Sequence, residues 1–168
     1  NYSTAVQWCE AAANILRAQK HGAVVAISSV AGDRGRQSNY AYGAAKGGVM
    51  GLMHGLAEAG EPHGILCNAY MPNANSRMTS DIKPGELGDN PWAGKLWQYF
   101  EPAYSVGLVT YLASNACTTH HGIYSALGGR IGRAFIGIAD GTLDDAPVDA
   151  DTVEAHWDVI RDDRLGYS

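Results

Sequence analysis

Apolar segments alternate along this chain with segments of helical periodicity, an order that is typical of α/β proteins. The run Ala23–Ile27 is apolar and rich in β-branched residues, which predicts a buried strand of a parallel sheet. The apolar stretch Gly64–Met71 predicts a second strand. Helices are predicted over Tyr2–Lys20, where good helix formers carry an apolar face, and over Asn39–Ala59. The pattern therefore predicts an α/β domain in which helices flank a parallel sheet.

Side chains with acid–base and hydrogen-bonding chemistry gather around the first predicted strand. Ser28 and Ser29 follow that strand directly, and the polar segment after them is rich in Gly, Arg, Ser and Asn and predicts a loop. Tyr42 and Lys46 stand four residues apart on the next predicted helix, so both lie on one helical face. Ligands of open α/β sheets bind just beyond the carboxyl ends of the strands, which is where Ser29 is expected.

The ammonium group of Lys46 is expected to change the acid–base chemistry of the Tyr42 phenol. A free tyrosine has a pKa near ~10 and exchanges protons poorly at neutral pH. A positive charge about 4 Å away contributes roughly 4 kcal/mol at an effective dielectric constant of about 20, enough to bring the phenol near pH ~7. A serine hydroxyl beside it can bind the same substrate oxygen. The three side chains thus predict proton transfer to or from an alcohol or carbonyl oxygen.

The spacing of these residues resembles the short-chain dehydrogenase/reductase family. Ser29 is followed, after twelve intervening residues, by Tyr42-x-x-x-Lys46. Asn1 lies twenty-eight residues before Ser29, where the family places an asparagine that holds a proton-relay water; the alternative is that Asn1 belongs to a helix N-cap. The segment His63–Thr79 looks like the family's next strand and the loop beside the nicotinamide.

The resemblance implies a Rossmann-like three-layer parallel sheet and a secondary alcohol/ketone oxidoreductase that uses NAD or NADP. It implies Tyr42 as the acid/base, Ser29 as the residue that orients the substrate oxygen, and Asn1 as support for the proton relay. Lys46 would favour the ionised phenol and bind the nicotinamide ribose. The full set of cofactor-binding residues that the resemblance implies is Tyr42, Lys46, Pro72, Asn73 and Ser76.

One branch of the family is closer than the rest. Most members read Pro-Gly where this chain has Pro72-Asn73, and the hydroxyacyl-CoA dehydrogenases read Pro-Asn-Ala-x-Ser-Arg-Met-Thr, as here. Three later segments also resemble that branch: its penultimate helix, its last strand with a following hairpin, and its closing helix, at Tyr104–Ser114, Gly122–Gly141 and Asp151–Trp157. A 3-hydroxyacyl-CoA is therefore the expected substrate. Residues 80–100 correspond to the family's substrate lid, or alternatively to a helix packed on the core.

The chain does not show the glycine-rich, phosphate-binding turn that opens domains of this kind. We therefore expect residues 1–168 to be the C-terminal portion of one such domain, lacking its N-terminal dinucleotide-binding half, with an exposed sheet edge and no activity on its own. Two alternatives stay open: another dehydrogenase of the family, acting on an acyl-carrier protein, a steroid or a polyol, and a non-catalytic dimerisation scaffold.

Composition and charge exclude several other classes. The net charge is −5 without a basic patch, so nucleic acid is not an expected partner. No apolar run approaches the ~18 residues of a membrane span. Cys9, Cys67 and Cys117 lack metal-ligand spacing and are expected to be reduced thiols of a cytoplasmic protein that holds no metal. The glycines of the Asn39–Ala59 helix imply close backbone approach, either within the monomer or in a homodimer or homotetramer.

Overall fold

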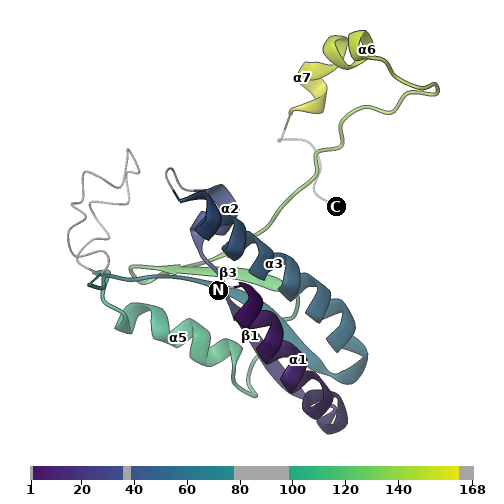
Figure 1. Ribbon diagram of the computed structural model, residues 1–168. Coiled ribbons are helices and arrows are strands. Elements are labelled where there is room, and N and C mark those ends of the chain that lie inside the picture. Colours follow the sequence, from purple (N-terminus) through teal and green to yellow (C-terminus); the bar gives the residue numbers. More distant parts are fainter. Residues whose placement is uncertain (1, 36–38, 78–98, 163–168) are drawn as a thin grey trace. The chain divides into compact units, whose positions relative to one another are not determined.

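The computed structural model describes residues 2–35, 39–77 and 99–162 (Figure 1). The chain forms two compact units, Asn1–Ala134 and Phe135–Ser168. The first contains the predicted sheet and every described residue that the sequence marks for chemistry.

A four-stranded sheet in the order β1-β2-β3-β4 forms the centre of the first unit. β1 (Gly22–Ile27), β2 (Ile65–Asn73) and β3 (Gly122–Leu127) run parallel, and β4 (Arg130–Ala134) returns antiparallel to β3. Both predicted strands and the predicted hairpin are thereby confirmed. β1 is a terminal strand of the described sheet.

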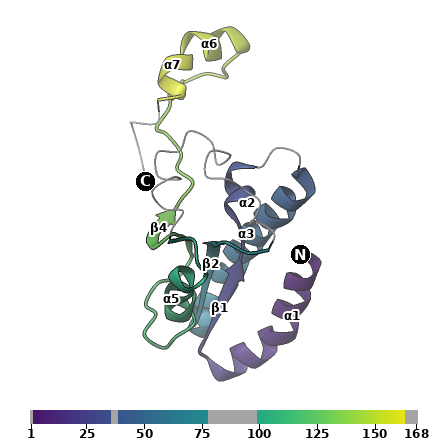
Figure 2. The same ribbon diagram turned by 90° about the vertical axis from the view of Figure 1, so that its left-hand side faces the viewer.

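Helices cover both faces of the sheet (Figure 2). α1 (Tyr2–Gln19) and α3 (Tyr40–Gly60) pack on one face, and η1 (Glu61–His63), a single 3-10 turn, leads from α3 into β2. α5 (Ala103–Leu112) packs on the other face. The three-layer α/β architecture is the one that the sequence predicts.

The core follows the alternation of side chains along β2, because successive residues of a strand point to opposite faces. Cys67, Ala69 and Met71 join Met53 of α3 in one buried cluster. Tyr70 points the other way and joins a second cluster, which also contains Leu108, Leu112, Cys117 and Ala126. β2 is therefore buried on both sides, as is usual in parallel sheets.

A short helix, α2 (Val30–Arg34), lies where the sequence predicts a loop. The loop prediction is therefore wrong for these five residues. Ser29 has an extended backbone, and its hydroxyl accepts a hydrogen bond from the N–H of Ala31 at 3.2 Å, as an N-cap does. Gly35, at a φ of 74°, ends the helix. A serine N-cap and a glycine C-cap thus convert a polar stretch into one turn of helix.

The second unit contains two short helices, α6 (Ala150–Ala155) and α7 (Trp157–Ile160). Asp149 caps α6 by accepting a hydrogen bond from the N–H of Thr152 at 2.9 Å. The closing helix predicted over Asp151–Trp157 is therefore present, but it breaks at His156 into two pieces. Within the described ranges, no helix has both the length and the apolar character to cross a bilayer.

Candidate active site

The residues marked by the sequence lie at the carboxyl edge of the sheet. β1, β2 and β3 are parallel, so their carboxyl ends meet at one edge. Ser28 and Ser29 follow β1, while Pro72 and Asn73 end β2. The N–H of Ser28 donates a hydrogen bond to the carbonyl of Tyr70 at 2.8 Å, which fixes the end of β1 against its neighbour.

Lys46 is held against this edge through both its side chain and its backbone. Its ammonium Nζ donates a hydrogen bond to the carbonyl oxygen of Ile27 at 2.8 Å, the last residue of β1. The Oγ of Ser28 donates one to the carbonyl oxygen of Lys46 at 2.7 Å. Lys46 is half-buried and is one of the residues that line an open groove along α1 and β1.

Tyr42 lies one turn before Lys46 on α3 and is half-buried. The Nζ of Lys46 stands 5.9 Å from the centre of the Tyr42 ring, within the range in which a cation and an aromatic ring attract. The placement of both side chains on one helical face is thereby confirmed. A phenol and an ammonium group beside each other are suited to proton transfer.

The close backbone approach that the glycines imply is made by α2 within the first unit. A Cβ built on Gly32 would stand 2.6 Å from the carbonyl carbon of Lys46 and from the N of Gly47. A Cβ built on Gly43 would stand 3.0 Å from the carbonyl oxygen of Ala31. The helix turn that carries Tyr42 and Lys46 therefore packs directly on the helix that Ser29 caps.

The Ser29 hydroxyl, at the same sheet edge, uses only one of its hydrogen-bonding positions for the N-cap. Its Oγ accepts the capping hydrogen bond from Ala31, and a hydroxyl also carries one O–H donor and a second lone pair. The O–H is the group needed to bind a substrate oxygen. Capping α2 and orienting a substrate are thus compatible roles for Ser29.

The predicted nicotinamide-side residues lie at the end of β2 and just after it, at the same edge. Pro72 and Asn73 are half-buried, and Ser76 is exposed three residues further on. The Oγ of Ser105, in the first turn of α5, donates a hydrogen bond to the carbonyl of Asn73 at 3.0 Å. Two further predictions lie outside the described residues: Asn1, and residues 78–98, which make up most of the expected lid.

Three buried polar residues received no role in the sequence analysis: Ser28, which it placed only at the end of a strand, Asn68 and Ser105. Asn68 is fully buried, donates from Nδ2 to the carbonyl of Thr119 at 2.9 Å and accepts from the N–H of Gly122 at 3.1 Å. It therefore fixes the loop that leads into β3. An asparagine inside an apolar strand, and a serine doublet at a strand end, were the available signals.

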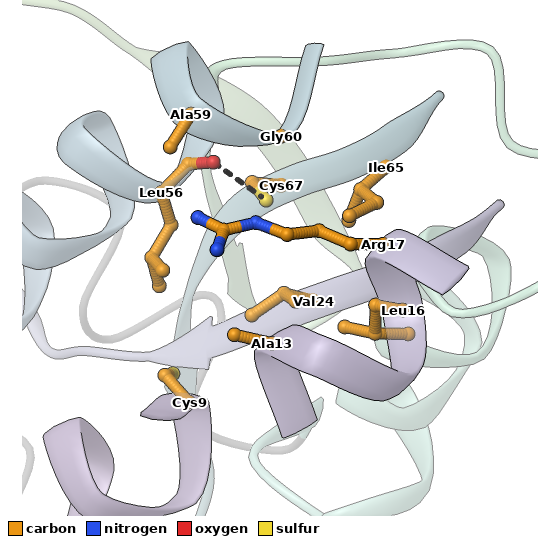
Figure 3. A pocket seen from close by; sticks show the side chains of 10 residues that line it. All are labelled: Cys9, Ala13, Leu16, Arg17, Val24, Leu56, Ala59, Gly60, Ile65 and Cys67. Carbon is orange, nitrogen blue, oxygen red and sulfur yellow. Dashed lines mark hydrogen bonds between the residues drawn. The ribbon is translucent and has the colours of Figure 1, made fainter. Parts of the chain in front are cut away.

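A small apolar cavity lies between α1, α3, β1 and β2 and includes Cys9, Arg17 and Cys67 in its lining (Figure 3). Its volume is about 40 Å³, far below the few hundred Å³ of a ligand pocket. Burial is the main cause and the charge of Cys9 the smaller one that together raise the pKa of the Cys67 thiol to about 11. The thiol donates to the carbonyl of Leu56 at 3.4 Å, shown dashed in Figure 3, so this space serves packing.

A mostly parallel sheet covered on both faces, with a Tyr-x-x-x-Lys turn at its carboxyl edge, is the arrangement typical of dehydrogenases that bind a dinucleotide. The family model described as short chain dehydrogenase matches residues 1–86. The chain belongs to the short-chain dehydrogenase family.

Among curated relatives, a short-chain type dehydrogenase/reductase of Mycobacterium tuberculosis is 34% identical over 146 residues, covering 87% of this chain and 48% of the relative. Mouse peroxisomal multifunctional enzyme type 2 is 30% identical over 159 residues, covering 93% of this chain and 20% of the enzyme. The chain thus spans about half the length of the first relative and a fifth of the second. The resemblance to this branch, expected from Pro72-Asn73, is confirmed.

Solved structures show the same architecture. Full-length peroxisomal multifunctional enzyme type 2 from Drosophila melanogaster superposes with a TM-score of 0.78 at 23% identity, covering 94% of this chain and 28% of that one. An NAD(P) dependent gluconate 5-dehydrogenase from Beutenbergia cavernae, with bound NADP at low occupancy, gives a TM-score of 0.64 at 25% identity. The match covers 77% of this chain and 53% of that one. The Rossmann-like fold class is confirmed.

Proposed function

We propose that the protein is an NAD(P)-dependent oxidoreductase that interconverts a secondary alcohol and a ketone. The observation that carries this proposal is the anchoring of Lys46 beside the Tyr42 ring and to the end of β1, two residues before Ser29. Membership of the short-chain dehydrogenase family supports it, as does the NADP bound to the structurally similar dehydrogenase from Beutenbergia cavernae.

The three side chains take distinct roles in this proposal. Tyr42 gives its phenolic proton to the carbonyl oxygen in reduction and takes it back in oxidation. Lys46 stabilises the phenolate that forms, because its positive charge is held beside the ring. Ser29 donates its O–H to the same substrate oxygen and fixes its position. Asn1 is proposed to support proton relay to solvent.

The residues present fit a nicotinamide cofactor at the carboxyl edge. An ammonium group has three donors, and Ile27 takes one from Lys46, which leaves two for ribose hydroxyls. Tyr42 would share the ribose, while Pro72, Asn73 and Ser76 would line the nicotinamide side. When bound, the cofactor supplies the hydride chemistry.

We propose a 3-hydroxyacyl-CoA as the substrate, because the chain carries Pro72-Asn73-Ala74 and resembles a peroxisomal multifunctional enzyme. A polyol is the second candidate, supported by the structural similarity to a gluconate 5-dehydrogenase. The alternative of a non-catalytic scaffold predicts no turnover of either.

Substrate profiling of the full-length protein tests these proposals. Reduced nicotinamide is followed while (3R)-3-hydroxyacyl-CoA esters or gluconate are offered with NAD⁺ or NADP⁺. We expect turnover of the acyl-CoA esters. Turnover of gluconate alone would replace the acyl-CoA by the polyol as the proposed substrate class. A full-length protein that turns over neither class would favour the non-catalytic scaffold.

We also propose a homodimer or homotetramer built on α3. A Cβ built on Gly51 or Gly55 meets nothing within 4 Å, so this part of α3 has open space beside it in which a second copy can pack. A cytoplasmic location is proposed on the free thiols of Cys9, Cys67 and Cys117. Because the mouse and fly relatives are named peroxisomal, cell fractionation is the test.

A further inference from the structure

Ser28 connects three elements at the proposed site without entering the proposed chemistry. The residue is only 3% exposed, so its hydroxyl cannot serve to bind a substrate. Its N–H donates to the carbonyl of Tyr70 on β2, and its Oγ donates to the carbonyl of Lys46 on α3. A single buried residue thus ties the end of β1 to the neighbouring strand and to the proposed catalytic helix.

The hydrogen bonds between β1 and Lys46 are reciprocal. The backbone carbonyl of Lys46 accepts a hydrogen bond from Ser28. The side chain of Lys46 donates one to the carbonyl of Ile27, the residue just before Ser28. Together they close a ring between the strand end and one turn of α3. We refer to this pair of hydrogen bonds as the strand–helix clasp.

The Ser28 hydroxyl is not needed to satisfy the Lys46 carbonyl. Lys46 lies inside α3, where each carbonyl oxygen accepts a hydrogen bond from the N–H four residues later. The hydroxyl occupies the second lone pair. Its effect is therefore on the position of this turn of α3 relative to β1 rather than on the integrity of the helix.

Position matters here because the lysine side chain is long and has many rotamers. The carbonyl of Ile27 can hold Nζ beside the Tyr42 ring only if the Lys46 backbone stands at a fixed distance from the strand end. Gly32 of α2 packs closely against the Lys46 backbone, and Ser28, at the end of β1, donates a hydrogen bond to it. The two contacts define where the ammonium group can stand.

We propose that Ser28 is a positioning residue of the site, which acts by holding the Lys46 ammonium group beside Tyr42. This inference rests on the proposed oxidoreductase function for its effect on turnover. It goes beyond that function because Ser28 touches neither substrate nor cofactor in the proposed chemistry.

Two measurements on the full-length protein test the clasp. In Ser28→Ala we expect kcat to fall about tenfold with little change in the KM for the alcohol, since small misplacements of reacting groups cost up to ~100-fold. The pH profile of kcat should move to higher pH, because the phenolate is then less well stabilised. Ser28→Thr keeps the hydroxyl and should restore both. Ser114→Ala is the control: it removes a hydroxyl that donates to the helix carbonyl of Tyr111 on α5.

The second measurement does not depend on catalysis. Acylation of Lys46 by limiting acetic anhydride is compared with that of Lys20, the exposed internal standard, by peptide mass spectrometry. A displaced ammonium group should react several-fold faster in Ser28→Ala and at the original rate in Ser28→Thr. The Ser114→Ala variant should match the original protein.

The outcomes separate the clasp from the proposed function. A lower melting temperature in Ser28→Ala with unchanged kcat, pH profile and Lys46 acylation would show a purely structural serine and overturn the inference. If the original protein turns over no alcohol, the proposed function fails, and the acylation rates alone still decide whether Ser28 positions Lys46.

Discussion

Lys46 is a charged side chain whose position is set by its surroundings rather than by its own preferences. Its four-carbon stem could place the ammonium group in many directions. The Ile27 carbonyl selects one of them, and this brings Nζ to 5.9 Å from the Tyr42 ring centre. At the scale of single residues, the proposed site is therefore a phenol beside a fixed positive charge.

Replacing Tyr42 by phenylalanine tests this arrangement at a single atom. Turnover of the preferred alcohol should fall by about 10² to 10⁴, because the general acid/base is removed. Steady-state kinetics of the full-length protein provide the measurement, and far-UV circular dichroism checks the fold.

Tyr40→Phe is the matched control, since it removes the same atom two residues earlier, from a residue that is 80% exposed. Its kinetics should equal those of the original protein. Equal activity of Tyr42→Phe would contradict the assignment of the acid/base.

At the scale of elements, the contact between α2 and α3 decides where the Tyr42–Lys46 turn lies. The contact requires a residue without a side chain at Gly32, because a Cβ there would come within 2.6 Å of backbone atoms at Lys46 and Gly47. Backbone atoms cannot move aside as the end of a flexible side chain can. The two helices would have to separate.

Gly32→Ala should therefore destabilise the protein by about 1–3 kcal/mol, the usual cost of overpacking. Urea unfolding measures the loss, and activity should fall with it as the turn shifts. Gly107→Ala on α5 is the control: nothing lies within 4 Å of the added Cβ, and alanine should stabilise that helix by up to about 1 kcal/mol. Equal free energies of unfolding for the two variants would contradict the tight packing.

At the scale of the whole sheet unit, a pair of histidines joins α3 to the loop before β3. The Nε2 of His121 and the Nδ1 of His54 lie 2.7 Å apart, and Glu58 stands 3.5 Å from the other ring nitrogen of His121. The neighbouring His120 accepts from the N–H of Cys67. A hydrogen bond between two imidazoles needs one N–H and one lone pair, so it is lost when both rings are protonated.

The pH dependence of stability follows from the direction of the His54 shift. Desolvation, and next the charge of His121, lower the pKa of His54 below its ordinary value of 6.5. The unfolded chain then binds the proton more tightly than the native protein. The stabilisation from this pair is complete above pH 6.5 and declines as the pH falls through the lowered native pKa.

His54→Asn keeps an acceptor near the position of Nδ1 but does not titrate. Between about pH 7.5 and about pH 5, its melting temperature should fall less steeply than that of the original protein. Parallel curves for the two proteins would show that the pair does not couple protonation to folding.

The open glycines of α3 lead to a prediction about assembly. Gly51→Leu places a bulky side chain in the open space where a second copy is proposed to pack. We expect the dimer dissociation constant to rise at least about tenfold, or about 1.4 kcal/mol, as measured by light scattering after size exclusion. Gly107→Leu, at an open glycine of α5, should leave assembly unchanged. A Gly51→Leu protein that assembles as tightly as the original would place the interface elsewhere.

The sequence by itself determined the features that depend on near neighbours along the chain. Apolar runs predicted β1 and β2, helical periodicity predicted α1 and α3, and a spacing of four placed Tyr42 and Lys46 on one face. These patterns are readable because a strand repeats every two residues and a helix every 3.6.

Only the tertiary structure decided which distant groups hold that site together. Ser28 meets Lys46 across 18 positions and His121 meets His54 across 67, and neither pairing leaves a periodic signal. The approach of Gly32 to α3 depends on α2, a single helical turn too short to show a pattern. Such contacts arise when the elements pack, so they follow from the three-dimensional arrangement and not from any local stretch of sequence.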